Sequence, residues 1–156
     1  MNIYGPIGMT KVQNNVYFKT TTKESLIENP KKIAMIAGGS GITPMIQLVN
    51  SSENVEFKLI YSNKTVQDIL CRKELQNLTG KLEVKHTLTR ETEVPEGFSV
   101  GRINLEMVQE FFDEDTDVIA ICGPPEFTTA AKEFCENLFE GYTHVGGKSG
   151  AFLFKN

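Results

Sequence analysis

The sequence contains no tryptophan, only two histidines and only three cysteines among its 156 residues. Cys71, Cys122 and Cys135 include no C-x-x-C pair, which excludes a four-thiolate zinc or iron–sulfur site within this chain and favours a reducing compartment. With so few sulfur and imidazole ligands, we expect no metal site of any kind.

Long apolar runs and an excess of positive charge are also missing. No run approaches the roughly 20 residues of a membrane-spanning helix, and the first residues lack the basic and apolar regions of a secretory signal. The 16 Lys and Arg residues stand against 20 Asp and Glu, which gives a net charge of −4. Nucleic-acid-binding domains normally carry a basic face. We therefore expect a cytoplasmic protein with no transmembrane segment that binds no nucleic acid.

The chain does contain a regular alternation of apolar runs and amphipathic stretches. Continuous apolar runs predict buried strands at 33–37 and 118–122, and further strands are predicted at 55–62, 82–89 and 150–154. Apolar spacing and capping residues predict helices at about 43–49, at 68–78, after Asn104 and after Pro125. This order predicts an α/β fold, a Rossmann-like doubly wound parallel sheet of about five strands with helices on both faces. Residues 1–32 are expected to form short extended pieces and loops, and the acidic run at 110–117 a solvated helix end and loop.

The first loop of this predicted sheet carries a glycine pattern. Sheets of this class bind ligands outside the carboxyl ends of their strands, where the strand order reverses. Residues 39–44 read GSGITP, one residue away from the dinucleotide fingerprint, and we expect Thr43 to cap the next helix with Pro44 at its first position. Such glycines let the backbone approach a pyrophosphate. An ordinary strand-to-helix turn is the alternative, but the place between a buried strand and a helix favours a nucleotide site.

The second strand lacks the acidic residue that usually follows it in dinucleotide-binding units. Residues 61–64 read YSNK, and Asp68 is the nearest carboxylate that could reach a ribose hydroxyl. No arginine follows this strand, so a 2′-phosphate would meet only Lys64, which favours NADH over NADPH. By spacing alone, Asp68 could equally be a helix cap.

The fourth strand ends in the sequence CGPP at 122–125. A thiol at this edge would lie close to any ring in the crevice, although a buried structural cysteine is the alternative. His86 and His144 have no serine or cysteine partner at a triad spacing, so we interpret both as non-catalytic.

Three ordered segments together resemble a known family. Residues 36–45 (IAGGSGITPM), 61–70 (YSNKTVQDIL) and 122–125 (CGPP) are similar to the nicotinamide-binding half of the NADH–cytochrome b5 reductases, within the ferredoxin–NADP reductase superfamily. Residues 88–90, 101–104 and 152–154 fit the same pattern, and residues 3–8 resemble the segment where the family's flavin barrel ends.

The resemblance implies a role for each matched residue. The pyrophosphate would lie against Gly39, Gly41 and Thr43, ahead of Pro44, with Ser40 facing the flavin. The adenosine side would be held by Tyr61, Ser62, Asn63 and Asp68. The nicotinamide would be framed by Cys122, Gly123, Pro124 and Phe127, with the Cys122 thiol near the carbon that gives up the hydride. Phe154 matches the terminal aromatic beside the flavin ring, although two residues follow it here.

The family's chemistry then sets the functional expectation. Hydride passes from NADH to FAD, and electrons leave singly to a haem or iron–sulfur acceptor. The Arg-x-Tyr-Ser/Thr element and the later glycine-serine element of the flavin barrel are absent from the chain. We therefore interpret residues 1–25 as the remnant of a flavin-binding barrel with its connector, and residues 26–156 as an NAD(P)-binding domain. The chain would be an NADH-dependent flavoprotein oxidoreductase only together with a flavin-binding domain or chain; the alternative is a stand-alone NAD(H)-binding or sensing module.

Overall fold

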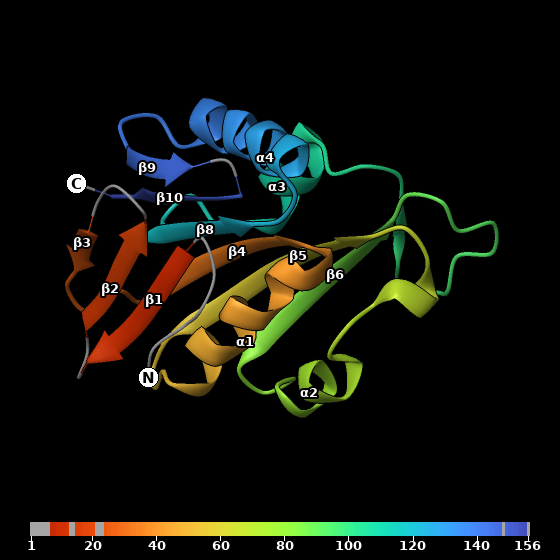
Figure 1. Cartoon of the computed structure of the whole chain (residues 1–156), viewed down its shortest axis with the longest axis horizontal. Helices are drawn as coiled ribbons and strands as arrows, with labels where there is room; N and C mark the ends of the chain where they lie inside the picture. Colours follow the sequence, from red (N-terminus) through yellow and green to blue (C-terminus); the bar gives the residue numbers. More distant parts are fainter. Residues whose placement is uncertain (1–6, 13–14, 21–23, 148, 156) are drawn as a thin grey trace.

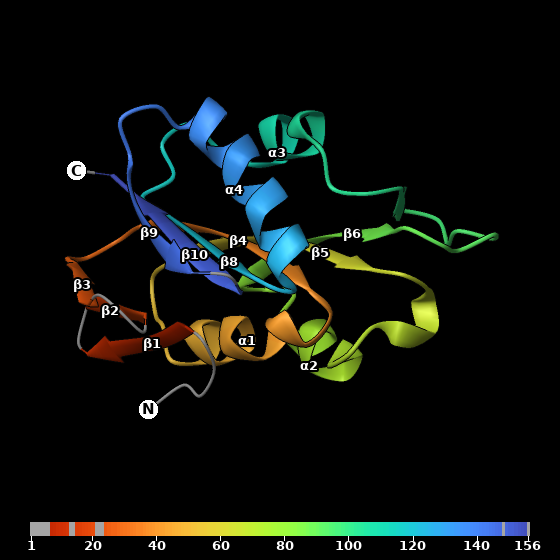
Figure 2. The same ribbon diagram turned by 45° about the horizontal axis from the view of Figure 1, so that its top comes forward.

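In the computed structural model, which describes residues 7–12, 15–20, 24–147 and 149–155, a seven-stranded sheet forms the centre of the molecule. One face is covered by helices α1 (Ile42–Asn50) and α2 (Arg72–Asn77), the other by α3 (Leu105–Phe111) and α4 (Pro125–Leu138), as Figures 1 and 2 show. The expected Rossmann-like α/β fold with helices on both faces is confirmed. None of the described helices is long and apolar enough to cross a membrane.

The sheet has the strand order β7-β6-β5-β4-β8-β10-β9. Its parallel part comprises β4 (Lys32–Gly38), β5 (Glu56–Asn63), β6 (Leu82–Leu88), β7 (Ser99–Val100) and β8 (Val118–Cys122). Beyond β8, the strands β10 (Gly150–Phe154) and β9 (Thr143–Gly147) are added antiparallel.

The predicted count of about five strands is therefore wrong, because the described residues form seven in this sheet. The sequence hides the two extra strands for different reasons. Strand β7 has only two residues, and β9 has four residues that are exposed or half-buried, with two glycines at its end, so neither forms an apolar run. Strand β10 was expected, but it runs antiparallel because it follows β9 as a hairpin.

The two faces of the sheet carry separate apolar clusters, since successive side chains of a strand point to opposite sides. In β4, Met35 and Ala37 pack into the cluster with α1 and α2, whereas Ala34 and Ile36 pack into the cluster with α3 and α4. All four are at most 2% exposed. A strand buried on both faces requires a continuous apolar run, which is why the sequence predicts β4 so clearly.

Helix α1 starts earlier than predicted. The 3₁₀ turn η1 (Gly39–Gly41) leads directly into it, so Gly41 occupies the capping position and Thr43 lies inside the first turn. Pro44 is tolerated at the third helical position because the N–H groups of the first turn have no intrahelical partner. On the other face of the sheet, the predicted cap of α3 is confirmed, because the Asn104 side chain accepts a 2.9 Å hydrogen bond from Met107 N–H. Helix α4 begins at Pro125.

The helix predicted over residues 68–78 is broken in two. A 3₁₀ turn η2 (Val66–Asp68) is separated from α2 by residues 69–71. Cys71 adopts a left-handed conformation with φ of 58°, which interrupts a helix. The spacing of apolar residues continues through this segment, so the break in the helix cannot be predicted from it.

A second, three-stranded antiparallel sheet consists of β1 (Ile7–Val12), β2 (Asn15–Thr20) and β3 (Glu24–Ile27), in that order. It lies beside the edge of the large sheet where the parallel strands begin, near the C-terminal end of β10, with β1 against α1 and β2 against β9 (Figure 1). The interpretation of residues 1–25 as a barrel remnant stays a prediction. Residues 3–6 of the matching segment at 3–8 lie outside the described part of the chain.

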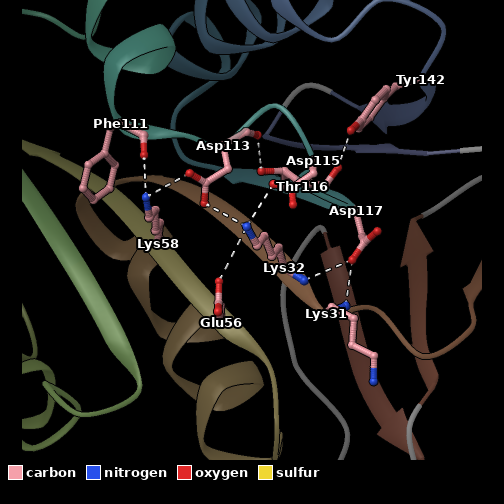
Figure 3. A network of polar contacts seen from close by, with 10 residues as sticks. All are labelled: Lys31, Lys32, Glu56, Lys58, Phe111, Asp113, Asp115, Thr116, Asp117 and Tyr142. Carbon is pink, nitrogen blue, oxygen red and sulfur yellow. Dashed lines mark hydrogen bonds and ion pairs between the residues drawn. The ribbon is translucent and has the colours of Figure 1, made fainter.

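The loop between α3 and β8 is tied to the beginning of β4, as Figure 3 shows. The Lys32 ammonium lies 3.0 Å from Asp115 and 3.6 Å from Asp113. The Asp117 carboxylate accepts hydrogen bonds from the backbone N–H groups of Lys31 and Lys32 at 2.7 and 3.0 Å. The acidic run is thus more than a solvated loop, because three of its carboxylates fix the start of β8 beside the start of β4.

Candidate functional site

The strand order reverses at β4, and this creates the candidate site. Strands β5 and β6 lie on one side of β4 and β8 lies on the other. Ala37 of β4 is paired with Cys122 of β8, so the loops that leave these two strands start side by side. Loops that diverge at such a switch point leave a crevice between them at the carboxyl edge of the sheet.

The loop after β4 fits against the backbone at the end of β8. A Cβ atom at Gly41 would lie 2.1 Å from the Cys122 carbonyl oxygen, so only glycine permits this approach. Gly39 has φ of 56° and open space around it, while Ser40 and Thr43 are exposed. Pro44 is buried beneath them. The loop therefore presents its backbone and two hydroxyl groups at the crevice.

The start of α1 is open towards a negatively charged group. No described side chain caps it, and its first turn carries no acidic residue. The first N–H groups of a helix lack intrahelical acceptors and carry partial positive charge. Together with the glycines, this arrangement is suited to a phosphate group.

The loop after β8 is packed on one aromatic ring. A Cβ atom at Gly123 would lie 2.6 Å from the Phe127 ring, and one at Gly38 would lie 3.1 Å from it. The half-buried Phe127 therefore covers the ends of both β4 and β8. Pro124 is exposed at the start of α4, and Thr128 donates a 3.3 Å hydrogen bond to the Gly123 carbonyl. The structure brings these residues of the CGPP segment together at one wall of the crevice.

Cys122 is the last residue of β8 and packs on the α1 side of the sheet, whereas Phe127 packs on the α4 side. Cys122 is 6% exposed and belongs to the apolar cluster on the α1 side. Burial raises the pKa of the Cys122 thiol, so the group stays protonated near neutral pH. It can contact a ligand but does not supply a thiolate nucleophile.

Tyr61 lies beneath the site rather than on its surface. The residue is 0% exposed. Its hydroxyl donates a 2.8 Å hydrogen bond to the Gly39 carbonyl and accepts one of 3.3 Å from the Leu70 N–H. Burial raises the pKa of the Tyr61 hydroxyl, against the opposing effects of the Leu70 N–H and the Asn63 amide, so it remains a donor. The sequence places Tyr61 against the adenosine, but its side chain reaches the site only through the backbone of the two loops.

Asn63, at the end of β5, carries a buried donor without a partner. The residue is 6% exposed, and its amide lies near enough to the Tyr61 hydroxyl to lower the pKa of that group. Its Nδ2 atom nevertheless has no partner at hydrogen-bonding distance and angle in the described part of the chain. An unpaired buried donor costs about 1–3 kcal/mol. An oxygen of a bound nucleotide would satisfy it. Ser62, next to it in β5, is 9% exposed and points to the opposite face of the sheet.

Two carboxylates contact the backbone of the loop after β5: Asp68 from the loop itself and Glu91 from the loop after β6, which sequence reasoning misses. Asp68 accepts hydrogen bonds from Thr65 N–H and Oγ1 at 3.1 and 2.8 Å, so it closes a capping box and is not itself the cap. Glu91, which follows β6, accepts a 2.9 Å hydrogen bond from Val66 N–H. It is 25 residues away in sequence. Only the parallel pairing of β5 with β6 brings the two carboxylates to one loop.

The same pairing places an arginine beside Lys64. The N–H of Arg90 donates a 2.8 Å hydrogen bond to the Lys64 carbonyl. No arginine follows β5 in the sequence, but the backbone of Arg90 lies next to that of Lys64 in the folded chain. A signal was available, because the loops after β5 and β6 are both expected at the carboxyl edge.

Phe154 is not brought to this site. In the antiparallel pair of β10 with β8, Phe154 lies opposite Val118 and Gly150 lies opposite Cys122. Phe154 is thus at the starting edge of β8, away from the crevice. The resemblance sets Phe154 beside the flavin ring rather than against the nucleotide, and that role stays a prediction.

Comparisons with known proteins agree with this geometry. Residues 35–133 match the family described as "Oxidoreductase NAD-binding domain". The chain is 40% identical over 113 residues to NADH-cytochrome b5 reductase 2 of Danio rerio. This match covers 65% of this chain and 36% of that protein. It is 35% identical over 136 residues to an NADH nitrate reductase of Ulva prolifera, covering 80% of this chain and 15% of that protein.

Among solved structures, the cytochrome b5 reductase domain of Ulva prolifera nitrate reductase is similar, with a TM-score of 0.68 and 28% identity. The match covers 86% of this chain and 53% of that domain. The chain thus spans about half of that domain, and 36% and 15% of the two curated relatives.

Proposed function

Because this chain belongs to the oxidoreductase NAD-binding domain family, in the group of the cytochrome b5 reductases and ferredoxin reductases, we propose that it binds NADH in the crevice between β4 and β8. There it presents the nicotinamide to a flavin held by a separate flavin-binding domain or chain. Bound NADH supplies a hydride, which FAD accepts before passing single electrons to a haem or iron–sulfur acceptor.

The observation that carries this proposal is the contact of Gly41 with the end of β8. The required glycine brings a backbone turn and the open start of α1 to the reversal point of the strand order. This is where the pyrophosphate of a dinucleotide binds in sheets of this type. Gly39, Ser40 and Thr43 would contact it beside Gly41.

At the adenosine end, the chain offers the unpaired Asn63 Nδ2 as a donor and Asp68 as a carboxylate for ribose hydroxyls. We favour NADH over NADPH, because Asp68 and Glu91 place two negative charges on the loop after β5. These charges oppose the cations Lys64 and Arg90 and disfavour an added 2′-phosphate.

At the nicotinamide end, Cys122, Gly123, Pro124 and Phe127 would form the wall that orients the ring. The neutral Cys122 thiol would touch the ring near its reacting carbon and exclude water, without moving a proton. A cytoplasmic location fits this proposal, since Cys71, Cys122 and Cys135 are all free thiols.

The test is a titration of the whole chain with NADH. Binding is monitored by the change in the fluorescence of the nicotinamide. We expect saturable binding that AMP competes away. Asn63→Leu should weaken it, whereas Asn77→Leu, at the far end of α2, should not. A chain that binds no NADH at millimolar concentration contradicts the proposal. Incubation with FAD and desalting then reports whether this chain holds flavin by itself.

A further inference from the structure

We propose that Tyr61 is a positioning residue whose buried hydroxyl sets the spacing between the two loops that hold the two halves of NADH. This inference rests on the proposed function. It gives Tyr61 a role different from direct contact with the nucleotide, which its complete burial excludes in this structure.

A single oxygen atom links the two loops. Tyr61 Oη donates to the carbonyl of Gly39, the first residue of the turn before α1, at 2.8 Å. It accepts from the N–H of Leu70, in the segment between η2 and α2, at 3.3 Å. The first loop is the proposed pyrophosphate site, and the second continues from the capping box of Asp68. Among the described residues, no backbone hydrogen bond outside the helices and strands joins these two loops directly.

The position of this oxygen is set by the core of the protein. The Tyr61 ring belongs to the apolar cluster beneath α1, and it packs at 46° against the His86 ring with centroids 5.8 Å apart. A ring fixed in this way holds its hydroxyl at one place. Phenylalanine would keep the ring packing and would leave both the Gly39 carbonyl and the Leu70 N–H without their partner.

The consequence differs between a ligand that spans both loops and one that occupies only one of them. NADH gains affinity from binding two subsites at once, and this gain depends on the distance between them. Adenosine, which has no phosphate, occupies only the subsite at the loop after β5. Reduced nicotinamide mononucleotide occupies only the subsite at the turn before α1, so neither ligand depends on that distance. Loss of the Tyr61 hydroxyl should therefore weaken NADH more than either half.

The experiment compares Tyr61→Phe with Tyr142→Phe in the whole chain. Tyr142 is a matched control, because its hydroxyl also donates to a backbone carbonyl, that of Thr116, at the opposite edge of the sheet. For Tyr61→Phe, we expect NADH to bind about tenfold more weakly, while the affinities for adenosine and reduced nicotinamide mononucleotide change by less than about twofold. Tyr142→Phe should leave all three affinities unchanged.

Each other outcome overturns the inference. Unchanged NADH affinity in Tyr61→Phe excludes any role for the Tyr61 hydroxyl in binding. An equal loss of affinity for NADH and adenosine reduces Tyr61 to a local support of the loop after β5. If the unaltered chain binds no NADH, the proposed function fails and this inference fails with it. If the unaltered chain binds NADH and only the variant result disagrees, the inference alone fails.

Amide hydrogen exchange of the unaltered chain supplies a second measurement that does not depend on the variant folding. Saturating adenosine should slow exchange in residues 64–70 and also in residues 39–45, because adenosine has no phosphate to contact the turn before α1 and Tyr61 connects the two loops. Protection confined to one loop would contradict the proposal.

Discussion

The ammonium group of Lys58, in β5, donates a 3.1 Å hydrogen bond to the backbone carbonyl of Phe111, the last residue of α3 (Figure 3). The same group lies 3.4 Å from Asp113 and 5.5 Å from the centroid of the Phe111 ring. The last carbonyls of a helix have no intrahelical partner and carry partial negative charge. Lys58 thus caps α3 from the sheet and joins the helix to the network at the starting edge of the strands.

Lys58→Met tests this cap. Methionine keeps most of the apolar stem and removes the donor, so we expect the free energy of unfolding to fall by about 1 kcal/mol. Urea denaturation measures it. Lys73→Met, at an exposed position in α2, is the control and should change stability by less than about 0.5 kcal/mol. Equal effects of the two substitutions would show that the Phe111 contact contributes nothing.

Gly41→Ala tests the fit of the loop against β8. The new Cβ would meet the Cys122 carbonyl at 2.1 Å, so the loop must move, and we expect a loss of about 2 kcal/mol or more in stability together with weaker NADH binding. Gly80→Ala is the matched control, since nothing lies within 4 Å of its added Cβ and its φ is not positive. Thermal unfolding and NADH titration of both variants decide the matter. A Gly41→Ala chain with the affinity of the original would separate this glycine from the nucleotide site.

Glu91→Gln tests the choice between the two nicotinamide cofactors. Glutamine can still accept the hydrogen bond from Val66 N–H, but the negative charge on the loop after β5 is removed. We expect the affinity for NADPH to rise about threefold to tenfold while that for NADH stays within about twofold. Glu96→Gln, in the exposed loop before β7, should change neither affinity. Parallel titrations with both cofactors supply the ratio, and an unchanged ratio would remove Glu91 from the specificity argument.

The His86 ring gives a pH-dependent contribution to stability. It stacks on Phe98 with centroids 4.6 Å apart, and burial, followed by the charge of Arg72, lowers the pKa of His86 below 6.5. The unfolded chain then binds a proton at a higher pH than the folded chain does, so this contribution is complete above pH 6.5 and declines as the pH falls below it. His86→Leu should flatten the decline in urea denaturation series, whereas His144→Leu, at a half-exposed site in β9, should retain it. The same slope in both variants would assign the pH dependence to other groups.

The sequence by itself determined the central strands and the positions of the loops that matter. Strands β4 and β8 are buried on both faces, and burial on both faces requires the continuous apolar runs that mark them in the sequence. The glycines at 39 and 41 mark the turn after β4 in the sequence, but the structure gives the reason for each: Gly39 has φ of 56°, and a Cβ at Gly41 would lie 2.1 Å from the Cys122 carbonyl oxygen.

Contacts between residues that are distant in the sequence are visible only in the tertiary structure. The pairing of β5 with β6 brings Glu91 to Val66 and Arg90 to Lys64, and the β9–β10 hairpin takes Phe154 to the far edge of the sheet. Tyr61 lies in a segment that resembles a nucleotide-binding motif, but its side chain is buried in the core. Its hydroxyl forms hydrogen bonds with the backbone of two loops. The spacing of apolar residues in a sequence indicates which face of a helix or strand is buried. The backbone atoms that bind a buried hydroxyl group are determined only when the elements pack together.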